Sequence, residues 1–104
     1  MGLFSFLGFG NSAIKKALLN GAAIIDVRTA HEFDQGHVRE AIHIPLDRIP
    51  ANIERIKNMG RPVIFCCASG ARSGQAVSML KAKGMKEVFN GGSWEKLIQL
   101  QKTL

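Results

Sequence analysis

The chain has 104 residues, of which 46% are hydrophobic and 21% charged, and its formal net charge at pH 7 is +6. These values predict one globular domain rather than a disordered or fibrous chain. The positive charge favours anionic partners. Because the lysines and arginines are scattered and no basic patch is interleaved with aromatic residues, we expect small inorganic anions and no nucleic acid.

The cysteine content predicts a reducing compartment. The two cysteines, Cys66 and Cys67, are adjacent and cannot form the crosslinked framework of a small secreted domain. No stretch approaches the roughly 20 apolar residues of a membrane span. Residues 1–10 lack the basic start and the small-residue cleavage site of a signal peptide. We therefore expect a cytoplasmic protein without a membrane span.

The chain begins with an apolar segment, residues 1–11, that contains Leu3, Phe4, Phe6, Leu7 and Phe9. It is interpreted as an edge strand or a flap over the core, with a weak contact to a membrane surface as the alternative. The main domain is expected to span residues 12–104. It opens with a short helix that Ser12 caps and Gly21 ends.

Four apolar runs of strand length follow, at residues 22–27, 41–44, 62–66 and 87–89. Between them lie helical patterns: a short helix with a capping box formed by Thr29 and Glu32, an amphipathic helix after Pro50, a helix over 73–83, and a last helix capped by Ser93. The alternation of strands and helices predicts an α/β domain with a mostly parallel sheet of four to five strands and helices on both faces.

The segment Cys67–Ser73 carries the chemistry. It places a thiol at the end of a buried strand, then small residues, then Arg72 where a helix begins. Small residues and Gly70 allow the backbone to curl so that successive amides converge on one point, and the helix dipole adds to their field. A thiol in that field ionises more readily, and the thiolate is the nucleophile. Arg72 can bind an oxyanion at the rim.

The sequence resembles the rhodanese-like family of sulfurtransferases from about Ser12 to Leu97. The segment Asp26-Val27-Arg28, followed by Glu32-Phe33 and Gly36-His37-Val38, is similar to the family's first motif. Residues 41–45 resemble its continuation, with His43 where Asn is commoner. Residues 67–73 match the active-site loop CxxGxRS, and 91–94 resemble the Gly-Gly signature before the last helix.

The resemblance implies a three-layer α/β/α domain without metal or organic cofactor. Cys67 would be the nucleophile that takes a sulfane sulfur from an anionic donor such as thiosulfate and forms a persulfide. Cyanide, a thiol or a protein would then remove that sulfur. Asp26 and Arg28 would hold structure. The resemblance also implies a substrate cradle consisting of Ala68, Ser69, Gly70, Ala71, Arg72 and Ser73. We expect the chain to act as a monomer.

Three alternatives remain open. Counted from Cys66, the sequence also contains the Cys-x5-Arg spacing of cysteine-dependent phosphatases and arsenate reductases, some of which share this fold. The domain could instead be a sulfur-relay or binding module without turnover of its own. Finally, Cys66 could exchange sulfur with Cys67 or form a strained disulfide with it, although strand packing is the simpler interpretation.

The three histidines, His31, His37 and His43, do not predict a metal site. They lack the spacing of zinc ligands, and no cysteine pair of suitable spacing accompanies them. His37 follows Gly36 and is expected to stabilise a turn, and His43 is expected in or beside the second strand.

Overall fold

The computed structural model describes residues 2–104, with side chains described from residue 11 onward. Its centre is a four-stranded sheet with the order β2-β1-β3-β4, in which all neighbouring strands are parallel. The α/β class and the parallel sheet predicted from the sequence are confirmed. The strands are β1 (Ala23–Asp26), β2 (Ile42–His43), β3 (Val63–Cys67) and β4 (Val88–Ser93).

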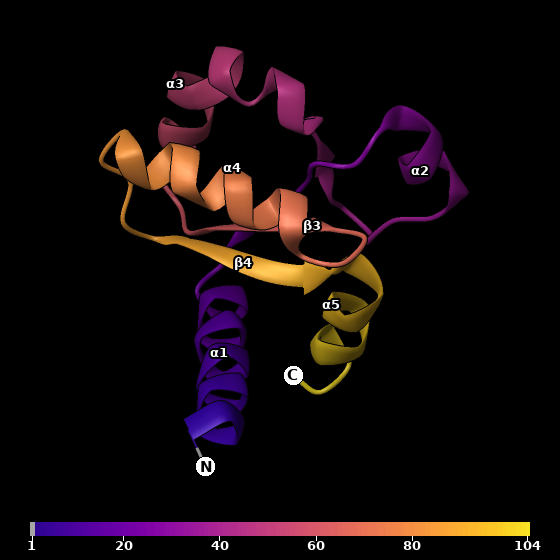
Figure 1. Ribbon diagram of the computed structural model, residues 1–104, viewed down its shortest axis with the longest axis vertical. Coiled ribbons are helices and arrows are strands. Elements are labelled where there is room, and N and C mark those ends of the chain that lie inside the picture. The colour runs from indigo at the N-terminus through magenta and orange to yellow at the C-terminus, as the bar shows by residue number, and fades with distance from the viewer. Residues whose placement is uncertain (1) are drawn as a thin grey trace.

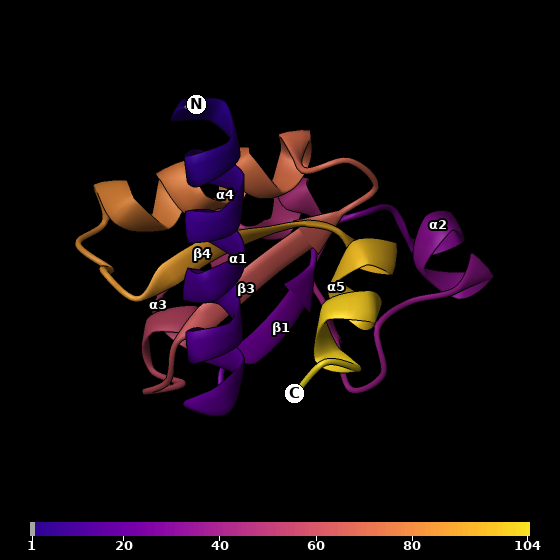
Figure 2. The same cartoon turned by 90° about the horizontal axis from the view of Figure 1, so that it is seen from below.

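Helices cover both faces of the sheet. On one face lie α3 (Ile53–Lys57) and α4 (Ala71–Ala82), and on the other lie α1 (Gly2–Leu19) and α5 (Trp94–Gln101) (Figures 1 and 2). Helix α2 (Ala30–Gln35) lies to one side, near the end to which the strand arrows point (Figure 2). Three layers result, as the family resemblance implied.

Strand β3 divides the apolar core into two clusters, because successive side chains of a strand point to opposite faces. Val63, Phe65 and Cys67 belong to the cluster under α3 and α4, together with Ile56 and Leu80. On the opposite face, Ile64 and Cys66 belong to the cluster under α1 and α5. All five residues of β3 are buried, so this strand is packed on both faces along its whole length.

The expectation of an edge strand at the N-terminus is wrong. Residues from Gly2 onward belong to α1, which runs without a break to Leu19. Ile14 and Ala17 anchor this helix on the sheet, and extending an existing helix adds one hydrogen bond per residue without a new nucleation cost. The expected flap and membrane contacts of residues 1–10 fall outside the described side chains. Within the described chain, no helix has the length and apolar character needed to span a bilayer.

The segment after the second strand also differs from its prediction. Instead of one amphipathic helix after Pro50, it forms two 3-10 turns, η1 (Leu46–Arg48) and η2 (Pro50–Asn52), followed by the five-residue α3. Pro50 is the first residue of η2, and because it has no amide hydrogen to donate, η1 does not continue through it as one regular helix. The apolar spacing was nevertheless informative, because Ile49, Ile53 and Ile56 are all buried.

Candidate active site

The predicted nucleophile lies at the carboxyl end of the sheet. Cys67 is the last residue of β3, and α4 begins four residues later at Ala71, two residues before the predicted start. Cys67 is only 1% exposed. In parallel sheets this edge is where ligands bind. The local sequence therefore places the thiol between a buried strand and the N-terminus of a helix.

The Cys67 sulfur accepts hydrogen bonds from the loop that follows it. The Gly70 amide lies 3.0 Å from Sγ and the Ser73 amide 3.4 Å, and the Ser73 hydroxyl is also 3.4 Å away. Burial opposes ionisation of the thiol. The Ser73 hydroxyl and the amides of Ser73, Gly70 and Ser69 outweigh burial, so the pKa of Cys67 lies below its ordinary value. The loop thus has the converging amides that the sequence predicted.

Gly70 gives the loop its curl. Its φ of 106° is in the left-handed region, which glycine adopts without strain. A Cβ at this position would also lie 3.4 Å from the Gly92 Cα. The loop and the end of β4 therefore approach each other closely. Ala68, Ser69 and Ala71 are small and exposed, which leaves the mouth around Cys67 uncrowded.

Cys66 is separated from the loop by the sheet. Its side chain is fully buried in the cluster under α1 and α5. Burial, followed by the charge of Asp26, raises the pKa of Cys66 to about 12. A thiol in that setting stays protonated and is a poor nucleophile. The geometry therefore supports the loop counted from Cys67 and disfavours both the Cys66-x5-Arg72 register and a pairing of the two sulfurs.

The sequence predicts that the Arg72 guanidinium can bind an incoming anion, but in the structure this guanidinium is already paired with a carboxylate. Its Nη1 lies 2.7 Å from Oε1 of Glu32, and its Nη2 lies 2.9 Å from Oε2. The hydrogen bond from Arg72 lowers the pKa of Glu32 to about 2. Both side chains are about one-third exposed. The pair therefore lies at the mouth around Cys67. Glu32 belongs to the candidate site, although the sequence predicted it only as part of a helix cap.

Asn90 is a second residue that the sequence reading missed. Its Oδ1 accepts hydrogen bonds from the Ser73 hydroxyl at 2.7 Å and from the Gly92 amide at 2.9 Å, and its Nδ2 donates to the Gly70 carbonyl at 3.0 Å. Strand β4 was predicted to end at Phe89. Instead it continues to Ser93, with a register shift opposite Phe65–Cys67. Only glycine fits at position 91 without a shift of its neighbours, because a Cβ there would lie 2.7 Å from Cγ2 of Ile64.

Asp26 and Arg28 have the structural part that the sequence analysis gave them. Three distances of 2.8–3.1 Å join the Arg28 side chain to the Asp26 carboxylate, and both residues are buried. Arg28 also donates to the Gly36 carbonyl at 2.7 Å and lies 4.7 Å from the ring centroid of Trp94. The ion pair thus fixes the segment that presents Glu32.

Two of the histidines are held by backbone and aromatic contacts. Nδ1 of His37 lies 2.8 Å from the Phe33 carbonyl, and Nε2 of His43 lies 2.8 Å from the Arg28 carbonyl. Both rings stack on Phe33, with centroid distances of 3.7 and 4.5 Å. They stabilise the connection between β1 and β2, in agreement with the turn-stabilising interpretation of His37.

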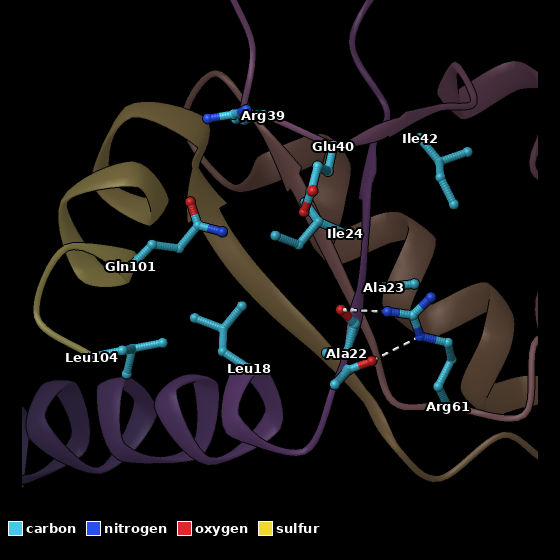
Figure 3. Close-up of a pocket in the computed structure, with 11 residues that line it drawn as sticks. Leu18, Ala22, Ala23, Ile24, Arg39, Glu40, Ile42, Arg61, Gln101 and Leu104 are labelled. Carbon is cyan, nitrogen blue, oxygen red and sulfur yellow. Dashed lines mark hydrogen bonds between the residues drawn. The ribbon is translucent and has the colours of Figure 1, made fainter.

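A cavity of the described molecule lies elsewhere. Its volume is about 710 Å³, and it opens beside the amino end of β1, the edge opposite to Cys67 (Figure 3). Arg61 on its wall donates to the carbonyls of Gly21 and Ala22 (Figure 3). None of the predicted site residues lines this cavity. The candidate active site is therefore separate from this cavity.

Comparison with known proteins agrees with this geometry. Residues 11–99 match the family model described as Rhodanese-like domain. The chain is 37% identical over 67 residues to the "Sulfurtransferase" of Allochromatium vinosum, which covers 64% of this chain and 62% of that protein. It is 36% identical over 69 residues to the "Thiosulfate sulfurtransferase PspE" of Escherichia coli, covering 65% of this chain and 66% of that protein.

Another similar protein, the "Uncharacterized protein YqhL" of Bacillus subtilis, is 36% identical over 69 residues, or 66% of this chain and 54% of that protein. The chain thus spans about half to two thirds of the length of these relatives. Among solved structures, a rhodanese-like domain protein from Staphylococcus aureus is 32% identical, with a TM-score of 0.68 over 84% of this chain and 86% of that one. A structure described as "rhodanese with anions from E. coli" is 33% identical, with a TM-score of 0.66 over 72% and 89%.

Proposed function

Because the chain belongs to the rhodanese-like domain family, we propose that it is a sulfurtransferase that works through a persulfide on Cys67. The donor is thiosulfate or a similar small anion, and the acceptor is a thiophile such as cyanide, a thiol or a protein. One observation carries the proposal: the Cys67 sulfur accepts hydrogen bonds from the Gly70 and Ser73 amides at the N-terminus of α4.

In the first half-reaction the Cys67 thiolate attacks the outer sulfur of thiosulfate. A bond forms between Sγ and that sulfur, the sulfur–sulfur bond of thiosulfate breaks, and its electron pair leaves with sulfite. The amides that lower the pKa of Cys67 supply the thiolate. We therefore assign no general base to this step, because the hydrogen bonds to Sγ favour the thiolate.

In the second half-reaction an acceptor attacks the outer sulfur of the persulfide. A bond forms between that sulfur and the acceptor, and the Sγ–sulfur bond breaks with its electron pair returning to Sγ. The Gly70 and Ser73 amides stabilise the thiolate as it leaves. The exposed small residues Ala68, Ser69 and Ala71 leave room for a thiol or a protein acceptor.

The named sulfurtransferases among the similar proteins support this reaction class over the alternatives. A phosphatase or arsenate reductase would need Cys66 to start the loop, and Cys66 is buried on the other face of the sheet with a raised pKa. A sulfur relay to a protein partner uses the same persulfide and differs only in the acceptor.

The proposal is tested by steady-state turnover of thiosulfate and cyanide, with sulfite and thiocyanate measured separately. Both products should appear in equal amounts with the wild-type chain and with Cys66→Ser, and neither with Cys67→Ser. Sulfite without thiocyanate would favour a relay that requires its protein partner. Turnover of an aryl phosphate or arsenate that depends on Cys66, with no sulfite, would overturn the proposal.

A further inference from the structure

Asn90 is the only described side chain that joins the active-site loop, α4 and the bulged end of β4 through one group. Its amide contacts the Gly70 carbonyl, the Ser73 hydroxyl and the Gly92 amide. Asn90 pairs with Phe65 on β3, and the register shift of β4 follows it, before Ser93 pairs with Cys67. These contacts determine how the hydroxyl nearest to the Cys67 sulfur is oriented.

The orientation of the Asn90 amide follows from its neighbours. The Gly70 carbonyl can only accept a hydrogen bond, so the group facing it must be the NH₂ of Asn90. The Gly92 amide can only donate, so it must face the oxygen. Both contacts agree on one orientation, and a flipped amide would oppose like groups at both ends. The atom 2.7 Å from the Ser73 hydroxyl is therefore an oxygen without a hydrogen.

The Ser73 hydroxyl has a single proton, and it donates this proton in a hydrogen bond to Asn90. At 2.7 Å from Oδ1 the hydroxyl donates to Asn90, so a lone pair of Ser73 Oγ faces the Cys67 sulfur 3.4 Å away. A neutral thiol can donate to that lone pair. The Ser73 hydroxyl lowers the pKa of Cys67 by donating to the thiolate, and it can do so only if it turns and gives up its hydrogen bond to Asn90. The amide oxygen and the thiolate therefore compete for one proton.

We propose that Asn90 is a positioning residue that acts on Cys67 through Ser73, holding the serine proton away from the sulfur until the thiolate forms. The hydroxyl turns to the sulfur when the thiolate is free and returns to Asn90 when the sulfur carries a proton or a second sulfur. Of these states of Cys67, only the one with a second sulfur, the persulfide, rests on the proposed function. The competition itself is a property of the loop.

Other groups also act on the charge of Cys67. Arg72 on α4 is paired with Glu32 on α2, and the buried pair of Asp26 and Arg28 lies on β1 and just after it. Cys66 on β3 stays protonated. Variants at Asn90 and Ser73 change none of these groups, so a difference between such variants reports the hydroxyl.

The test is a double-mutant cycle on the pKa of the Cys67 thiol. The pKa is read from the pH dependence of iodoacetamide alkylation, with the adduct located by mass and no sulfur donor present. Asn90→Ala is expected to lower the pKa of Cys67 by about one unit, because the freed hydroxyl donates to the thiolate. In the Ser73→Ala background the same substitution should leave the pKa unchanged.

An equal shift in both backgrounds would overturn the proposal, because Asn90 would then act only by supporting the loop. A rise in the pKa that is confined to the background with Ser73 would also overturn it. Asn52→Ala is the matched control, since the Asn52 amide also donates to a backbone carbonyl, that of Arg48, but outside the active-site loop. If Asn90→Ala fails to fold, Asn90→Ser replaces it, because a serine hydroxyl can still bond the Gly92 amide but is too short to reach Ser73.

Failure of this test is distinguishable from failure of the proposed function. The alkylation measurement needs no sulfur transfer and gives a result for any chain with this loop. Conversely, turnover of thiosulfate by Cys67 would stand even if Asn90 shifted the thiol pKa equally in both backgrounds.

Discussion

Arg72 and Glu32 form a two-point ion pair at the mouth of the site, with nitrogen–oxygen distances of 2.7 and 2.9 Å. The same carboxylate accepts a hydrogen bond at 3.0 Å from the amide of Thr29, the residue that caps α2. One carboxylate thus ties α2 to the start of α4 across 40 residues of sequence. It also neutralises a cation that would otherwise face an anionic donor.

Because Arg72 is paired with Glu32, removing Arg72 should affect the binding of an anionic donor. Arg72→Ala leaves the Glu32 carboxylate unpaired at the mouth, where it repels a dianion such as thiosulfate. The KM for thiosulfate should rise by roughly tenfold. Adding Glu32→Gln to Arg72→Ala should recover part of that loss, because the repelling charge is gone. Steady-state kinetics of the two variants check both statements, and an unchanged KM in Arg72→Ala would remove Arg72 from the site.

The same pair predicts a pH dependence of stability. The pKa of Glu32 is lowered to about 2 in the folded chain, so the pair stabilises the fold fully above the pKa of an unfolded glutamate, about 4.3. This contribution is lost as the pH falls from there towards 2. Because both side chains are partly exposed, it amounts to about 1 kcal/mol at most.

Urea unfolding at pH 6 and pH 3 measures this contribution, with Glu32→Gln as the reference. The wild-type chain should lose more free energy of unfolding between the two pH values than the variant does. Equal losses would mean that the ion pair does not stabilise the chain in solution.

The two cysteines should differ sharply in reactivity. Hydrogen bonds lower the pKa of Cys67, whereas burial raises the pKa of Cys66 to about 12. At pH 7 the folded chain should take one iodoacetamide adduct, on Cys67, and a second only after unfolding in urea. Folded Cys67→Ser should take none. Mass spectrometry of digests checks this, and rapid labelling of Cys66 in the folded state would contradict the assignment.

The buried ion pair of Asp26 and Arg28 should dominate the stability of the segment after β1. Asp26→Ala leaves the Arg28 guanidinium buried without a counter-charge and should lower the free energy of unfolding by about 3 kcal/mol or more. Asp34→Asn, at an exposed carboxylate on α2, is the matched control and should change it by no more than about 0.5 kcal/mol. Urea denaturation compares them, and equal effects would refute the structural assignment.

Most of the fold could be predicted because its signals are local. Continuous apolar runs marked all four strands, and the capping box of Thr29 and Glu32 marked α2, where both of its hydrogen bonds are present. The structure of the N-terminal segment was not predictable, since its Leu residues favour a helix, its Phe residues favour a strand, and its Gly residues weaken both. Its helix depends on the packing of Ile14 and Ala17 against the sheet, which no local pattern reveals.

The site could be predicted only in part, for a related reason. Cys67 and its amide cradle follow from residues within seven positions of one another. Glu32 and Asn90 reach the loop from segments 40 and 17 residues away, and their role depends on which side chains the fold brings together. Asn90 did carry a signal, because it precedes Gly91-Gly92, where small residues indicate a close approach between segments.

Intact mass shows directly whether Cys67 carries a transferable sulfur. The reduced chain is weighed before thiosulfate, after thiosulfate, and after cyanide, in parallel with Cys67→Ser and Cys66→Ser. We predict the gain of one sulfur atom on the wild-type chain and on Cys66→Ser, its loss on addition of cyanide, and no gain on Cys67→Ser. Absence of sulfur uptake by the wild-type chain, or uptake that persists in Cys67→Ser, would rule out a transferable persulfide on Cys67.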